Sequence, residues 1–183
     1  AKKGFELAMQ RSKKLCCVDK ANVLETSRLW RETVQGMEKD YPEVTVSYEF
    51  VDAVAMRLVQ WPNSYDVLIT ENLFGDILTD EASVISGSMG LMPSASIGLK
   101  TSLFEPIHGS YPQAAGKDIA NPLATVLSAA MMFEDAFQLK SEAQAIRDVV
   151  NKSLAEGIVT EDLSDGGKSY KTSEVGDWLA AHV

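Results

Sequence analysis

The chain has 183 residues, 45% of them apolar and 23% charged, which is ordinary globular usage and excludes a collagen-like, low-complexity or wholly disordered chain. The 26 acidic residues outnumber the 17 basic ones, so the formal net charge is −9. Nucleic acids and anionic membranes favour basic patches, so neither is expected as a partner. No apolar run approaches the roughly 18 residues of a membrane span, and no signal-peptide pattern is found near the start.

The first half of the chain alternates apolar patterns of helical and strand period. Three predicted strands separated by helices indicate an α/β architecture whose sheet is covered on both faces. In chain order we expect the end of a helix at 5–9, a strand at 14–19, a helix at 24–38, a strand at 44–50, a helix at 52–61, a strand at 66–70 and a helix through 75 to about 86.

The composition changes after residue 86. Residues 87–96 are rich in small side chains, and we interpret them as a crossing between two domains, residues 1–90 and residues 91–183. A long loop over 105–122 follows, and three helices are then expected, at 123–139, 142–155 and 173–181.

The two cysteines, Cys16 and Cys17, are adjacent within the first predicted strand. A disulfide between neighbours would be strained and no metal-binding spacing is present, so we predict two buried, reduced thiols. Reduced thiols together with the lack of a secretion signal favour a cytoplasmic location.

Two acidic residues of one predicted helix, Asp76 and Asp80, are four positions apart. Both carboxylates therefore lie on one helix face, where their repulsion weakens the helix by roughly a few tenths of a kcal/mol unless a cation lies between them. Oxygen ligands at this spacing suit Mg²⁺ or Mn²⁺. The alternative, favoured by the spacing alone, is a solvated pair stabilised by the helix dipole.

Polar residues also follow the first two predicted strands. Lys20 and Asn22 follow one strand and Asp52 follows the next, and the carboxyl edge of an open α/β sheet is where ligands bind. Lys20 at this edge suits an anion clamp or a proton carrier. The alternatives are a surface lysine with its ammonium group in water and a helix N-cap at Asp52.

The loop from Glu105 to Pro122 contains His108 and ends in Asn121 and Pro122, a typical N-cap followed by proline at the first helical position. Backbone amides at such a helix start can receive an adenine or phosphate group. The chain has neither a GxGxxG fingerprint nor a Walker motif, so a simple turn-rich loop is the alternative.

Together and in this order, these segments resemble the isopropylmalate branch of the β-decarboxylating dehydrogenase family. The resemblance implies that family's two-domain α/β fold, here represented by its C-terminal half, and the chain's beginning at Ala1 without Met then fits a truncated start. The amino-acid sequence of residues 72–78 favours the isopropylmalate branch. The matching stretches are residues 19–25, 27–31, 71–83, 87–95 and 105–122.

The resemblance implies a metal-dependent oxidative decarboxylation of 3-isopropylmalate to 2-oxoisocaproate, with hydride transfer to NAD, in leucine biosynthesis. Relatives that act on isocitrate or tartrate share the lysine and the paired aspartates, and they are the alternative. The family's substrate-binding arginines and catalytic tyrosine lie in its N-terminal half. A further alternative is therefore that the isolated chain is a non-catalytic dimerisation and metal-binding module.

The resemblance also assigns the roles of the family's site residues to matching positions of this sequence. The proton-handling lysine falls on Lys20, with Asn22 beside it near substrate and nicotinamide, and Asp52 also meets the substrate. The ligands of Mg²⁺ or Mn²⁺ fall on Asp52, Asp76 and Asp80. In the family, the equivalents of Lys20 and Asp52 serve the active site of the partner subunit, so the resemblance implies a homodimer.

The NAD site of the family falls on the long loop. His108, Gly109 and Ser110 are the nucleotide-binding residues, and Ala120 and Asn121 close over the adenosine. Gln113 departs from the pattern, because NAD-specific members usually carry Asp there. A glutamine can accept hydrogen bonds from the ribose hydroxyls but does not repel a 2′-phosphate, so we expect NAD with weakened selection against NADP.

Overall fold

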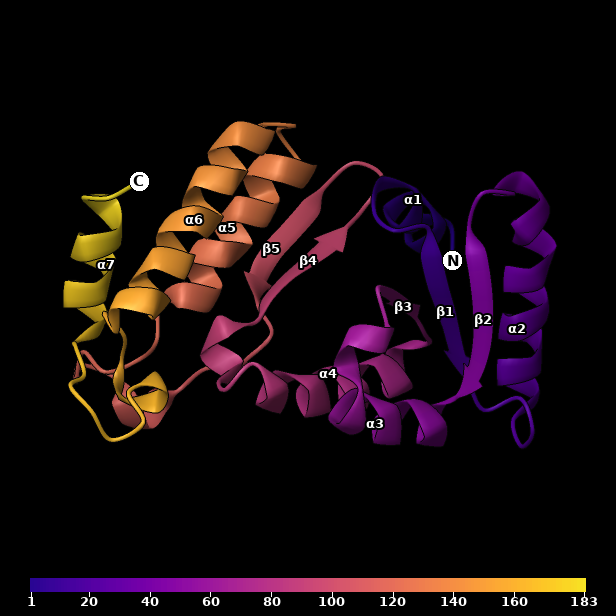
Figure 1. Cartoon of the computed structure of the whole chain (residues 1–183), viewed down its shortest axis with the longest axis horizontal. Coiled ribbons are helices and arrows are strands. Elements are labelled where there is room, and N and C mark those ends of the chain that lie inside the picture. Colours follow the sequence, from indigo (N-terminus) through magenta and orange to yellow (C-terminus); the bar gives the residue numbers. More distant parts are fainter. The chain divides into compact units, whose positions relative to one another are not determined.

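A computed structural model describes all residues, 1–183, and they divide into two units, Ala1–Ile85 and Ser86–Val183 (Figure 1). The equivalence of these units to the two domains of the resembled fold stays a prediction. None of the helices combines the length and the apolar character that a membrane crossing needs.

The first unit is built on a parallel sheet of three strands in the order β2-β1-β3. All three strands were expected from the apolar patterns, and so were the helices between them. The elements are α1 (Lys2–Gln10), β1 (Lys14–Asp19), α2 (Glu25–Met37), β2 (Thr45–Phe50), α3 (Val51–Gln60), β3 (Val67–Ile69) and α4 (Asn72–Ile85).

Alternate side chains of the central strand β1 enter two different cores. Cys17 packs with Phe5 of α1 and Val34 of α2 on one face of the sheet. On the other face, Cys16 and Val18 pack with residues of α3 and α4. Helices therefore cover both faces, which confirms the α/β prediction.

Both cysteines are free and buried, as predicted. Burial raises the pKa of Cys16 to about 11 and that of Cys17 to about 12. Both thiols are therefore protonated at neutral pH and behave as small apolar side chains rather than nucleophiles.

The second unit pairs an antiparallel hairpin with three helices. Helix α5 packs against both strands and against α6, and α7 packs on α6. Buried residues of the three helices, including Leu123, Val150 and Val175, form its core. The elements are η3 (Met89–Leu91), β4 (Pro93–Ile97), β5 (Ser102–Pro106), η4 (Pro112–Ala114), α5 (Leu123–Asp135), α6 (Lys140–Glu156), η5 (Glu161–Leu163) and α7 (Thr172–Ala180).

Two sequence expectations for this unit need correction. Residues 87–96 are not only a crossing, because β4 begins at Pro93 and pairs with β5. The small residues of β4 have little intrinsic strand preference, and the pairing with β5 supplies the missing stabilisation. The helix expected to reach residue 139 ends at Asp135, and Gln138 has a left-handed backbone that no helix continues through (φ 57°).

Candidate active site

The carboxyl edge of the parallel sheet gathers the polar residues that follow its strands. The Nζ atom of Lys20, after β1, makes an ion pair with Asp52 Oδ1, near the start of α3 after β2. The Lys20 side chain is only 25% exposed, and its Nζ lies 5.8 Å from the centroid of the Phe50 ring. Lys20 is therefore a sheltered, paired lysine, in contrast to the solvated surface lysine of the alternative interpretation.

Asp52 lies in the first turn of α3 and does not cap it. The helix begins at Val51 with Phe50 at the N-cap position, and no side chain caps the end, so the N-cap interpretation of Asp52 is wrong. The hydrogen bond from Lys20, together with the backbone amide of Asp52, lowers the pKa of this carboxyl group below its usual value. Asp52 therefore presents an ionised carboxylate at the sheet edge.

Asp76 and Asp80 lie on one face of α4, and both are exposed. Neither carboxylate makes an ion pair within the chain. Asp76 is already beyond the first turn of the helix, where the dipole has little effect, so dipole stabilisation does not account for the pair. Two unpaired carboxylates on one face fit the oxygen-donor chemistry of Mg²⁺ or Mn²⁺.

A single chain does not gather a complete set of metal ligands. No group of three His, Cys, Asp or Glu side chains is positioned to hold an ion, so Asp52 does not join Asp76 and Asp80 within one copy. The family resemblance implies this separation, because it assigns Asp52 to the partner's site. Asn22, in the turn after Lys20, is exposed.

The second unit contains a cavity of about 570 Å³, a volume typical of small-molecule sites. Of the residues predicted to bind the cofactor, five line it: His108, Gly109, Ser110, Ala120 and Asn121. Gln113 is exposed in η4 and is not part of the lining. The sequence interpretation missed the remaining lining residues, which are Met89, Gly90, Tyr111, Ile119, Glu161 and Asp162.

Asp162 fixes one wall of this cavity. Its carboxylate accepts hydrogen bonds from Ser88 Oγ (2.5 Å), Thr160 Oγ1 (2.5 Å) and Asn121 Nδ2 (2.9 Å). Burial raises the pKa of Asp162, but these three hydrogen bonds outweigh it and the net pKa is lowered. Asn121 in turn accepts the backbone N–H of Leu123 through Oδ1 (2.9 Å), which satisfies a free amide at the start of α5.

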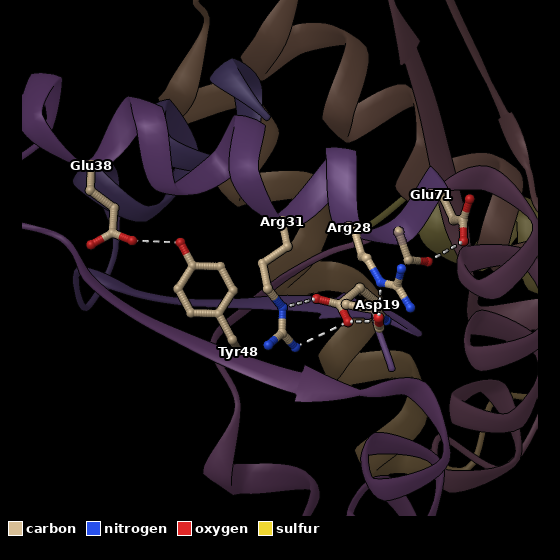
Figure 2. A network of polar contacts seen from close by, with 8 residues as sticks. Asp19, Arg28, Arg31, Glu38, Tyr48 and Glu71 are labelled. Carbon is tan, nitrogen blue, oxygen red and sulfur yellow. Dashed lines mark hydrogen bonds and ion pairs between the residues drawn. The ribbon is translucent and has the colours of Figure 1, made fainter. Parts of the chain in front are cut away.

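A second polar network surrounds the strand end that precedes Lys20 (Figure 2). Asp19 is completely buried, and Arg31 of α2 binds both of its oxygens, Nε to Oδ2 at 2.7 Å and Nη2 to Oδ1 at 3.0 Å. The hydrogen bond to Asp19 raises the pKa of Arg31, although burial opposes the rise. The spacing of 12 residues between the two partners gives no periodic signal, and the sequence interpretation missed them.

A model of the isocitrate/isopropylmalate dehydrogenase family matches residues 1–179. The chain belongs to this family. It is 56% identical over all 183 residues to a 3-isopropylmalate dehydrogenase of Bacteroides fragilis and covers 52% of that protein. It is 54% identical to a 3-isopropylmalate dehydrogenase of Desulfitobacterium hafniense, over 97% of this chain and 51% of that protein. The chain spans about half the length of the curated relatives it matches.

Solved structures of the family have the same fold. The isocitrate dehydrogenase of Methylococcus capsulatus matches with a TM-score of 0.93 at 37% identity, over 99% of this chain and 54% of that one. A β-decarboxylating dehydrogenase of Thermococcus kodakarensis matches with a TM-score of 0.88 at 36% identity, over 99% of this chain and 52% of that one. Membership of the isocitrate/isopropylmalate dehydrogenase family confirms the resemblance and the fold class, while the roles of single residues stay predictions.

Proposed function

We propose that this chain is part of a cytoplasmic, metal-dependent enzyme that oxidatively decarboxylates 3-isopropylmalate in leucine biosynthesis, with NAD as the hydride acceptor. The supporting observation is the identity of 54–56% over nearly the whole chain to relatives named 3-isopropylmalate dehydrogenase. The isocitrate dehydrogenase of Methylococcus capsulatus is 37% identical. The two free, buried thiols support a reducing compartment.

Lys20 is the proton acceptor in this proposal. To accept a proton Lys20 must be a neutral amine, a form that desolvation and charge repulsion from a neighbouring divalent cation would favour over the ammonium ion. In that form it would take the proton of the substrate hydroxyl as hydride leaves the same carbon, with Asn22 beside it towards substrate and nicotinamide. The contact of Lys20 Nζ with Asp52 and its shelter by the Phe50 ring restrict where the amine can lie. Such restriction favours transfer because the acceptor need not be ordered during the reaction.

Asp52, Asp76 and Asp80 are the proposed ligands of Mg²⁺ or Mn²⁺. The exposed, unpaired carboxylates of α4 support this assignment, as does the ionised state of Asp52. When bound, a divalent cation polarises the hydroxyl and carboxylate of the substrate and stabilises negative charge that develops during decarboxylation.

The cavity of the second unit is the proposed site of the adenosine part of NAD. His108, Gly109, Ser110, Ala120 and Asn121 all line it. Asn121 is oriented by its hydrogen bonds to Asp162 and Leu123, so the cavity wall needs little ordering when a ligand binds. Gln113, outside the lining, is the proposed contact to the ribose, and NAD is the expected cofactor.

A second copy of the chain is the proposed partner. Five large apolar side chains of α3 and α4 are between 57% and 77% exposed, more than isolated surface residues require, and burial against a second copy would remove them from water. A homodimer would also bring Asp52 of one copy to the carboxylates of the other. These apolar residues are Met56, Val59, Leu73, Ile77 and Val84.

The test uses the full-length protein with Mg²⁺, NAD and one of three acids: 3-isopropylmalate, isocitrate or tartrate. Turnover of 3-isopropylmalate is expected. Turnover of isocitrate alone would reject 3-isopropylmalate as the substrate. Lys20→Ala should abolish turnover, while the control Lys14→Ala, at the other end of β1, should not. The isolated chain of 183 residues should bind Mg²⁺ and NAD without turnover.

A further inference from the structure

The turn after β1, residues 20–23, is held at both backbone polar groups of Ala21, the residue between its two proposed functional residues. Ala21 N–H donates to Asp19 Oδ1 at 2.8 Å, and Ala21 O accepts from Arg28 Nε at 2.9 Å. Lys20 and Asn22 are the neighbours of Ala21 on either side. Fixing both polar groups of this residue therefore fixes the backbone from which Lys20 and Asn22 extend.

Asp19 can hold the turn only because Arg31 holds Asp19. A completely buried carboxylate needs a charge partner, and the planar guanidinium of Arg31 binds both oxygens at once. The guanidinium also lies over two rings of β2, 5.5 Å from the Tyr48 centroid and 5.3 Å from that of Phe50. Tyr48 is fixed in turn, since its hydroxyl donates to Glu38 at 2.5 Å.

Phe50 connects this network to Lys20 by a second route. Its ring is approached by the Arg31 guanidinium and by Lys20 Nζ, whose distance to the centroid is 5.8 Å. Asp19 and Phe50 are also directly opposite each other in the β1–β2 pairing. Arg31 therefore restrains both the backbone that bears Lys20 and the ring against which the Lys20 side chain rests.

Stability alone is a poor explanation for this arrangement. Replacing a buried ion pair by apolar residues of similar volume is often neutral or stabilising, so a fold gains little from it. We propose that Asp19 and Arg31, with Arg28, are positioning residues that set the place of Lys20 and Asn22 for the reaction. The inference rests on the proposed proton-accepting role of Lys20.

Two arginine variants of the full-length protein test the proposal. Arg31→Lys keeps the charge but loses the bidentate hydrogen bonds to Asp19. Arg28→Lys, at a more exposed position, loses the hydrogen bond to Ala21 O and is not expected to impair folding. The matched control is Arg57→Lys, because Arg57 pairs with a β2 carboxylate, Glu49, at 2.8 Å and makes no contact with the turn.

Hydrogen exchange of residues 20–24 and steady-state kinetics are the two measurements. Both test variants should exchange these amides at least about tenfold faster than the control and lose at least about tenfold in kcat, with the KM for NAD changed less than about twofold. Exchange and kcat equal to those of the control would overturn the proposal. So would a kcat loss accompanied by unchanged exchange, because the defect would then lie outside the turn.

The proposed function fails in a different way. If Lys20→Ala kept its kcat, Lys20 would not be the proton acceptor. The positioning role would then also be rejected, whatever exchange rates were measured. If Lys20→Ala were inactive while Arg31→Lys and Arg28→Lys behaved like the control, only the positioning role would be rejected.

Discussion

Replacing Arg31 with Met should destabilise the protein strongly, because it leaves the completely buried carboxylate of Asp19 without a cation. Removal of one partner of a buried pair typically costs about 3–5 kcal/mol. Asp19→Leu should cost less, about 1–3 kcal/mol by the same reasoning, since the Arg31 side chain is 27% exposed and water can partly solvate its freed charge. The double variant removes both charges and should lose no more than about 1 kcal/mol.

Urea unfolding of the full-length protein, followed by circular dichroism, measures these differences. A loss of about 4 kcal/mol lowers the midpoint by roughly 2 M when the slope is about 2 kcal/mol/M. The double-variant cycle should give a coupling of at least about 3 kcal/mol between the two sites. Two results would refute the reasoning. One is a loss in unfolding free energy below about 1 kcal/mol for Arg31→Met, and the other is a double variant whose loss equals the sum of the two single losses. The stable double variant should nevertheless have a low kcat, since the Ala21 N–H then loses its acceptor at Asp19 and the Lys20 turn is less restrained.

Two further predictions concern the first unit. Gly4→Ala should destabilise by about 1–3 kcal/mol, because its Cβ would lie 2.2 Å from a side-chain carbon of β3, whereas Gly36→Ala, with nothing within 4 Å, should stabilise by up to about 1 kcal/mol in thermal unfolding. Hydrogen bonds from Ser12 and Arg11 lower the pKa of Asp66 to about 2, and an NMR titration should find it there rather than near 3.8. Because the folded pKa is the lower one, the stabilisation is present above about pH 4 and is lost as pH falls towards 2.

The parallel sheet and its edge were predictable because they depend on local patterns. Apolar periods located β1, β2 and β3, and the rule that ligands bind at carboxyl ends placed Lys20 and Asp52 at one edge before their contact was known. The rule works because parallel strands all end on the same side. Helix α4 likewise fixes its two aspartates on one face through spacing alone.

The missed features depend on contacts between distant parts of the chain. Asp162 meets Ser88 across 74 positions and Asn121 across 41, so no local pattern connects them. Asp19 looked like an ordinary strand end because its burial follows from the packing of α2 across the sheet. Hairpin strand β4 was missed because its stabilisation comes from its partner strand rather than from its own small residues.

Metal binding and dimerisation should be coupled in this protein. Helix α4 bears both Asp76 and Asp80 and three of the exposed apolar residues, among them Ile77 and Val84, two turns apart. A partner that covers these apolar side chains must therefore approach the carboxylates closely. Asp52, the third proposed ligand, does not reach them within one chain, so the complete ligand set depends on the second copy.

Val59→Glu in the full-length protein tests this coupling, because it places a charge among the apolar residues two helical turns from Asp52, the one proposed ligand on its helix. Sedimentation should show monomers, and calorimetry should show Mg²⁺ affinity at least about tenfold weaker, since one carboxylate of the ligand set is then missing. The control Leu99→Glu alters an exposed apolar residue of the second unit and should change neither quantity. A monomeric variant that bound Mg²⁺ with unchanged affinity would show that the two carboxylates of α4 suffice, and the shared site would have to be abandoned.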